Sequence, residues 1–200
     1  FYPKRTSKGK SMSLLQNLME LIPLLIWFIL CGIGGFWLVC ALFHLKPHEE
    51  LMVGVAVGLS ASTFLVNILG RFFPLPNACW LSAGLIFISG MLLMGAEHKH
   101  DLKQLIIFPY QPVMWIAFLG VTLLFWGMAS GLSIMDEFQT LPLISQLAAG
   151  DLPLHFPLDP KVIYNYHYFP YLFSAQLMRL GNLFPWTALD IQQALFASLS

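Results

Sequence analysis

Hydrophobic residues form long runs separated by short polar segments. Four runs lack Asp, Glu, Lys, Arg and His, and each is long enough for the roughly 20 residues that cross a bilayer as a helix. We therefore predict four membrane-spanning helices in residues 1–135, over residues 21–43, 51–70, 72–96 and 108–133. Another apolar segment covers residues 185–200, where we expect a further span to begin.

Composition agrees with this pattern. Hydrophobic residues make up 58% of the chain and charged residues 10%, whereas soluble domains usually contain about a quarter charged residues. The composition therefore predicts an all-α fold, a polytopic transmembrane bundle that contacts membrane lipid. The formal net charge is zero, so no nucleic-acid partner is expected. Because the chain starts on Phe1 and stops within an apolar pattern, we expect it to be a fragment of a longer membrane protein.

A loop of mixed composition is predicted over residues 136–184. Within it we expect a short helix over about residues 141–149, because Thr140 is a good N-cap, Pro142 is tolerated in a first turn and Gly150 is a common left-handed stop. This helix is too short to cross a bilayer, and its apolar residues share one side. We therefore predict that it lies in the membrane interface.

Two adjacent carboxylates, Asp136 and Glu137, open this loop at the predicted membrane boundary. They could simply end the fourth span, since a charged group costs less at the boundary than at the bilayer centre. Neighbouring carboxylates repel each other, however, so in partly dry surroundings they are expected to share a proton or a cation. We therefore predict that both are catalytic residues, and that they are the ligands if a divalent cation is bound.

An aromatic cluster lies later in the loop, where Tyr166, His167 and Tyr168 combine hydroxyl groups, an imidazole and flat rings. A structural role is one interpretation, because aromatic side chains form belts at membrane interfaces. The cluster also suits a ligand with a sugar or a phosphate, because rings stack on sugar faces and a protonated imidazole donates to anionic oxygen. Together with the cations Lys161 and Arg179, these residues are predicted to bind substrate.

The loop resembles the first catalytic loop of GT-C membrane glycosyltransferases, in particular the bacterial relatives of protein mannosyltransferases and of lipid A aminoarabinose transferase. The likeness covers residues 125 to about 180. It consists of an acidic pair after a transmembrane helix, a short helix that ends in Gly-Asp, a proline and an aromatic return to the next helix. The matching residues are Asp136, Glu137, Gly150, Asp151, Pro153 and Tyr166 to Tyr168.

This resemblance implies a multi-pass enzyme of the bacterial plasma membrane, which takes a sugar from a polyprenyl-phosphate carrier and passes it to an acceptor at the extracytoplasmic face. It implies that Asp136 carries out the acid–base or metal-linked chemistry. An acceptor hydroxyl must lose a proton as it attacks the anomeric carbon, and a nearby carboxylate can take that proton. The relatives place this loop after their first transmembrane helix, whereas here it follows the fourth predicted span.

Orientation depends on where the chain starts. If the basic tail of residues 1–10 is present, the positive-inside tendency holds it in the cytoplasm, and the loop as well. If Met12 is the start, the remaining basic residues decide the orientation. Three lysines then lie on one side and one arginine on the other, namely Lys46, Lys99, Lys103 and Arg71. This second arrangement places the loop outside the cytoplasm, and we adopt it as the prediction.

A non-catalytic membrane subunit or a transporter segment is the alternative function. A carboxylate at the edge of the membrane is compatible with proton or cation handling. The first three predicted spans, however, carry no acid or base in mid-helix and no paired broken helices, which a transporter would favour. The sequence therefore favours the glycosyltransferase over the transporter.

Overall fold

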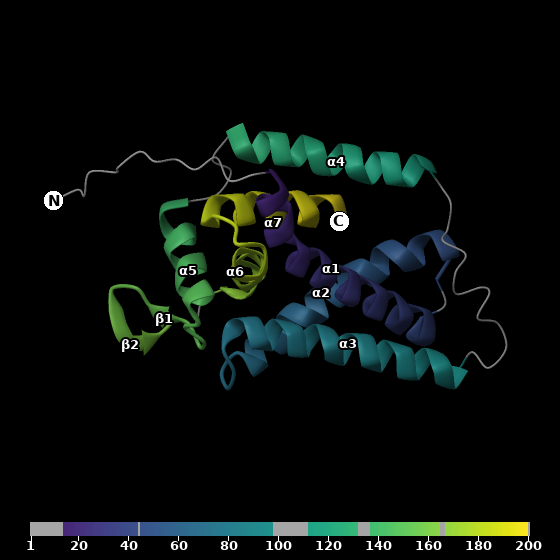
Figure 1. The fold of residues 1–200 in the computed structure, drawn as a ribbon, viewed down its shortest axis with the longest axis horizontal. Coiled ribbons are helices and arrows are strands. Elements are labelled where there is room, and N and C mark those ends of the chain that lie inside the picture. The colour runs from purple at the N-terminus through teal and green to yellow at the C-terminus, as the bar shows by residue number, and fades with distance from the viewer. Residues whose placement is uncertain (1–13, 44, 98–111, 132–136, 165–166, 200) are drawn as a thin grey trace.

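The computed structural model describes residues 14–43, 45–97, 112–131, 137–164 and 167–199. Within these ranges the chain forms seven helices and one short β-hairpin (Figure 1). The elements in chain order are α1 (Leu14–Leu42), α2 (Pro47–Leu69), α3 (Leu75–Glu97), α4 (Pro112–Gly131), α5 (Glu137–Ala149), β1 (His155–Phe156), β2 (Asp159–Ile163), α6 (Phe169–Gly181) and α7 (Pro185–Leu199). The fold is thus mostly helical, as predicted.

Three helices are long and apolar enough to cross a membrane. The qualifying segments are Met19–Leu42 in α1, Glu49–Leu69 in α2 and Leu75–Gly95 in α3. They agree with the first three spans predicted from the uncharged runs. The fourth predicted span coincides with α4, which is apolar over Ile116–Met128 and packs against α7. That α4 crosses the membrane stays a prediction.

Glycines bring α1, α2 and α3 into direct backbone contact. A Cβ atom added to Gly35 of α1 would lie 2.6 Å from the Cα atom of Gly58 in α2. A Cβ atom added to Gly34 would lie 2.8 Å from the Cα atom of Phe87 in α3. Small residues at such interfaces let helix backbones approach closely, which is how helices associate within lipid. The glycines therefore fix the arrangement of the three long helices.

Buried polar side chains link neighbouring helices. The hydroxyl groups of Ser62 in α2 and Ser82 in α3 lie 2.9 Å apart, and both side chains are fully buried. Gln176 of α6 donates from Nε2 to the Thr63 hydroxyl of α2 over 3.3 Å. Ser174 of α6 donates to the Oε1 atom of Gln192 in α7. These hydrogen bonds satisfy groups that would otherwise be costly to bury.

The helix α5 differs from the predicted short helix in where it starts. It begins at Glu137 and not near residue 141, so Thr140 lies inside the helix, where it is 3% exposed, and is not the N-cap. Pro142 lies in the second turn, where it lacks the N–H group for an intrahelical bond. The end is as predicted, because Gly150 has a positive φ of 99° and its N–H group donates to the Leu147 carbonyl over 2.9 Å.

Two elements of the loop were not predicted. The proline-rich stretch forms the hairpin of β1 and β2, in which His155 pairs with Ile163 and Phe156 with Asp159. The following stretch forms α6, which ends at Asn182 in a left-handed conformation with a φ of 49°. The predicted all-α class therefore needs a small β-hairpin added to it, and the predicted loop contains a second, largely buried helix.

Both helices of this loop pack on the protein. Leu143, Ile144, Leu147 and Ala148 of α5 are buried, and α5 contacts α6 and α7. Phe173 of α6 is 1% exposed and lies against Trp27 of α1, with ring centroids 6.1 Å apart. Figure 1 shows α5 lying crosswise at the left-hand end of the long helices. The two helices thus form a layer across one end of the α1–α3 bundle.

Candidate active site at the loop end of the bundle

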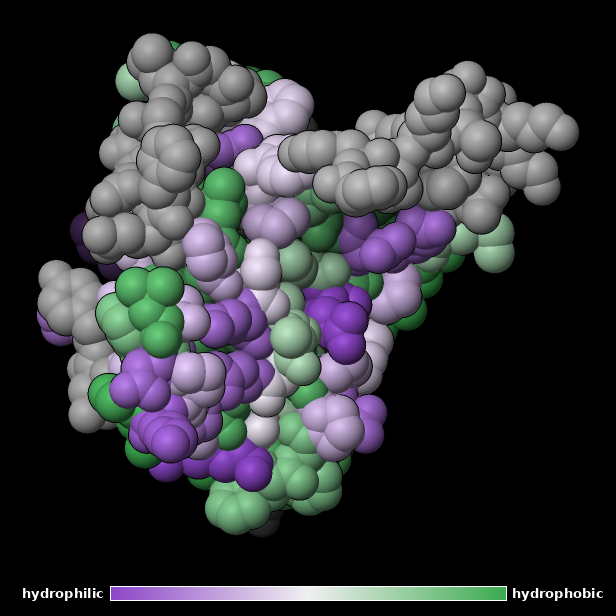
Figure 2. Space-filling model, turned by 90° about the vertical axis from the view of Figure 1, so that its left-hand side faces the viewer, coloured by the Kyte–Doolittle hydropathy of each residue, from purple (hydrophilic) through white to green (hydrophobic). Residues whose placement is uncertain are grey.

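We call this end of the molecule the loop end; it comprises residues 70–74, which join α2 to α3, together with α5, the hairpin and α6. Hydrophilic residues gather there, as Figure 2 shows with this end toward the viewer. The opposite end includes the connection between α1 and α2. Of the predicted site residues that the structure describes, all lie at the loop end. The loop end is therefore the candidate active site.

The predicted catalytic pair is only partly within the described residues. Asp136 lies outside them, as does the predicted substrate-binding residue Tyr166. The backbone of Glu137 begins α5 at the loop end. Among the side chains that the structure describes, no three His, Cys, Asp or Glu residues come together in a way that could hold a metal ion. That Asp136 and Glu137 bind a cation stays a prediction.

Tyr168 has a clear structural contact. Its hydroxyl group donates to the Oδ1 atom of Asn67 in α2 over 2.7 Å, although the two residues are far apart in the sequence. Tyr168 also directly precedes α6, so this bond fixes the start of α6 to the end of α2. Its neighbour His167 is exposed at the same place. That His167 and Tyr168 bind substrate stays a prediction.

The two predicted cations lie apart from this pair. Lys161 is exposed on β2 of the hairpin. Arg179 is exposed in the last turn of α6, and it is separated from Tyr168 by nearly the whole helix, about 16 Å at the usual rise of an α-helix. The predicted substrate-binding residues therefore do not form one compact cluster.

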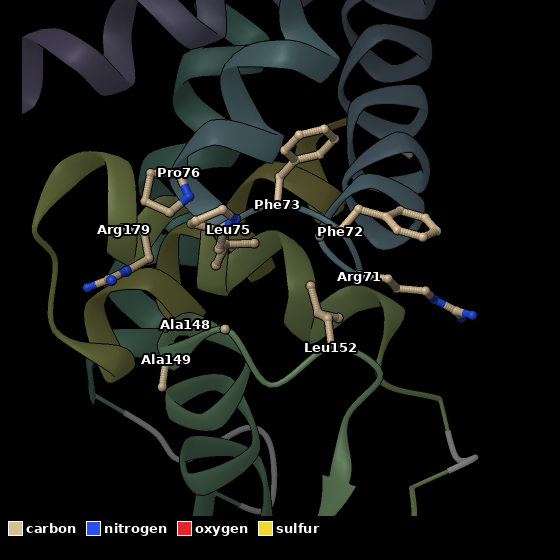
Figure 3. Close-up of a pocket in the computed structure, with 12 residues that line it drawn as sticks. Arg71, Phe72, Phe73, Leu75, Pro76, Ala148, Ala149, Leu152 and Arg179 are labelled. Carbon is tan, nitrogen blue, oxygen red and sulfur yellow. The ribbon is translucent and has the colours of Figure 1, made fainter.

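Arg179 instead lines a hollow of about 330 Å³ between α6, the end of α5 and the α2–α3 connection. Figure 3 shows Arg179 and Arg71 at opposite sides of this hollow, with their guanidinium groups directed away from each other. The backbone at Gly70 and Gly150 also lines it. Sequence analysis did not connect Arg71 with the site, because Arg71 lies more than 100 residues before Arg179.

A second feature that sequence analysis missed is the pair formed by Asp151 and His155. The Nδ1 atom of His155 lies 2.6 Å from Oδ1 of Asp151, and the backbone N–H of His155 donates to the other carboxylate oxygen over 2.9 Å. Both side chains are about one-third exposed. Asp151 lies two residues after the end of α5 and His155 begins β1, so the pair fastens the hairpin to the end of α5.

The arrangement of Asp151 and His155 could also take part in proton transfer. A carboxylate bonded to one imidazole nitrogen fixes the tautomer and leaves the other nitrogen to accept or donate a proton. The spacing of four residues with Pro153 between them was the available sequence signal. By itself this spacing does not show that the chain turns back between the two side chains.

Comparison of the chain with protein families, curated proteins and solved structures gave no match.

Proposed function

We propose that this protein is a GT-C-type membrane glycosyltransferase that transfers a sugar from a polyprenyl-phosphate carrier to an acceptor at the extracytoplasmic face of a bacterial plasma membrane. The main support is the position of α5. It begins at Glu137, directly after Asp136, and lies across one end of an apolar helical bundle. His167, Tyr168 and Arg179 lie at that same end.

A transfer at this site needs a base and a group that stabilises the departing phosphate. Asp136 is the proposed base, which accepts the proton of the acceptor hydroxyl as its oxygen attacks the anomeric carbon. Glu137 is proposed to tune Asp136 or to share a cation with it. The sugar–phosphate bond breaks in the same step, and cationic side chains of the loop end stabilise the negative charge on the phosphate.

The proposal is tested by replacing Asp136 with Asn in the intact protein. Transfer of a labelled sugar from a polyprenyl-phosphate donor is expected to fall by roughly 100-fold or more, the usual scale for losing a general base. Asp159→Asn is the matched control, because Asp159 is an exposed carboxylate in the same loop. Equal rates for Asp136→Asn and the unaltered protein would remove Asp136 from catalysis. No transfer by the unaltered protein with such donors would favour the membrane-subunit alternative.

Orientation is tested by cysteine labelling in a variant whose Cys31, Cys40 and Cys79 are replaced by Ala. Leu158 in the hairpin is 87% exposed, and Phe43 at the opposite end of the bundle is 52% exposed. A cysteine at Leu158 is expected to react with an impermeant thiol reagent in intact cells, and one at Phe43 only after lysis. The reverse pattern would place the loop in the cytoplasm.

A further inference from the structure

The hollow between Arg71 and Arg179 has an unusual distribution of charge. Two arginines from separate elements line it, and no Asp or Glu belongs to its lining. Neither guanidinium group has a hydrogen bond or ion pair with another described residue. Asp151 adjoins the lining and is hydrogen-bonded to His155 through both carboxylate oxygens. Glu20 accepts a hydrogen bond from Asn182, three residues after Arg179. The residues that line the hollow are therefore cationic, and the neighbouring acids have other partners.

The helix ends around the hollow do not cancel this charge. Helices α2, α5 and α6 end beside it with their negative poles, and α3 begins beside it with its positive pole. A helix end corresponds to about half an elementary charge, so these ends amount to roughly one negative charge against the two positive charges of the guanidinium groups. In addition, the last carbonyls of α5 accept hydrogen bonds from the N–H groups of Gly150 and Asp151. The lining residues and the helix ends taken together therefore keep a net positive charge.

The depth of the hollow fits the headgroup layer of a membrane. Arg71 follows the last residues of the apolar segment of α2, and α3 starts just four residues later, at Leu75. Between them Phe72 and Phe73 are 76% and 45% exposed. Exposed aromatic residues at the ends of apolar helices are typical of the membrane–water interface. At that depth the commonest anionic group is a phosphate carried by a lipid.

We propose that this hollow binds the phosphate group of the lipid-linked sugar donor, with Arg71 and Arg179 as its two cationic contacts. This inference rests on the proposed glycosyltransferase function, and it adds Arg71 and a location to it. Figure 3 shows both guanidinium groups directed away from the hollow. Both side chains are exposed and lack partners among the described residues, so they are free to rotate toward a bound phosphate. Arginine suits this role because its planar fork donates two parallel hydrogen bonds to phosphate.

The test measures binding of farnesyl phosphate, a short isoprenoid phosphate, to the intact protein in phosphatidylcholine nanodiscs. Farnesol, which has the same chain without the charge, is the neutral probe and is expected to bind at least about 10-fold more weakly. Replacing either arginine with Gln is expected to weaken farnesyl phosphate binding about 10-fold, and replacing both about 100-fold. Lys46→Gln is the control, because Lys46 is an exposed cation at the opposite end of the bundle and does not line the hollow.

Lysine variants separate ligand binding from stabilisation of the helix ends. Arg71→Lys and Arg179→Lys keep a positive charge at the ends of α2 and α6 but lose the guanidinium fork. The double Lys variant is expected to keep the thermal stability of the unaltered protein and to bind farnesyl phosphate about 10-fold more weakly. If the arginines serve only the helix ends, the Gln variants will lose stability and every variant will keep its preference for farnesyl phosphate over farnesol. That result would overturn the proposal.

Two further results bear on the source of the phosphate and on the proposed function. Phosphatidylglycerol added to the nanodiscs is expected to compete weakly; competition as strong as that of farnesyl phosphate would assign the hollow to bulk lipid and overturn the proposal. Loss of binding in the Gln variants of a protein that transfers no sugar would support the hollow and count against the glycosyltransferase. Full sugar transfer with an unchanged donor KM in the double Gln variant would support the glycosyltransferase and count against phosphate binding in the hollow.

Discussion

The α1–α3 bundle and the layer of α5 and α6 at the loop end are held together in different ways. In the bundle, Gly35 and Gly58 allow two helix backbones to touch. In the layer, large apolar side chains such as Ile144, Leu147 and Phe173 are almost completely buried instead. Large apolar side chains are buried in both regions, but in the bundle glycines also bring the helix backbones into contact.

The proposed membrane location of α1, α2 and α3 would account for this difference. Apolar side chains gain little by moving from lipid to a protein interior, so helices within lipid associate through close backbone packing and interhelical hydrogen bonds. At the membrane–water boundary, burial removes apolar surface from water and contributes roughly 25 cal/mol for each Å². Small residues thus specify the bundle, and large apolar residues specify the layer that positions the site.

A charge placed in the layer is expected to have the largest effect on stability. Ile144 is fully buried in α5, so Ile144→Asp buries a carboxylate without a partner and should lower the free energy of unfolding by about 4 kcal/mol. Thermal unfolding in nanodiscs measures this change. The neighbour Ser145 is exposed, and Ser145→Asp should have little effect. Equal melting temperatures for the two variants would contradict the packed layer.

A methyl group added between α1 and α2 is expected to have the next largest effect. A Cβ atom at Gly58 would collide with the backbone carbonyl of Cys31, so Gly58→Ala should destabilise the protein by about 3 kcal/mol. Nothing lies within 4 Å of a Cβ atom added to Gly84, and Gly84→Ala should be neutral or stabilising by up to about 1 kcal/mol. The two variants are compared by thermal unfolding. A stable Gly58→Ala protein would show that α1 and α2 do not need this contact.

Loss of one of the hydrogen bonds that join the two regions, the bond between Tyr168 and Asn67, is expected to have the smallest effect. Tyr168→Phe removes the hydroxyl group that bonds Asn67, which should cost about 1 kcal/mol of unfolding free energy. Tyr171→Phe is the control, since the Tyr171 hydroxyl has no hydrogen bond to a described residue. If Tyr168→Phe left stability unchanged but raised the donor KM of sugar transfer several-fold, the substrate-binding role predicted for Tyr168 would replace the structural one.

The bundle was easier to predict from the sequence than the layer. A helix that crosses a membrane needs about 20 apolar residues, so uncharged runs mark α1, α2 and α3 directly. The end of α5 was also predictable, because Gly150 adopts a backbone conformation that other residues avoid. Both predictions depend on local features of the chain.

The rest depends on contacts between distant residues. Helix α6 is largely buried against other helices, and its aromatic start was interpreted as part of a loop. Thr140 was predicted as an N-cap from its type alone, but α5 extends a turn further back and buries it. The hollow between Arg71 and Arg179 forms only when the α2–α3 connection meets the end of α6. No local pattern contains that information.

The burial of Trp27 has a consequence for the order of assembly during synthesis. Its ring in α1 is covered in part by Phe173 of α6, which leaves the ribosome much later. At typical elongation rates the interval is on the order of ten seconds, longer than helices need to insert and pack. The glycine contacts of α1, α2 and α3 need nothing from the later chain. If the three helices insert in a membrane as proposed, we expect a three-helix intermediate to form first, with the Trp27 face in lipid until α6 covers it.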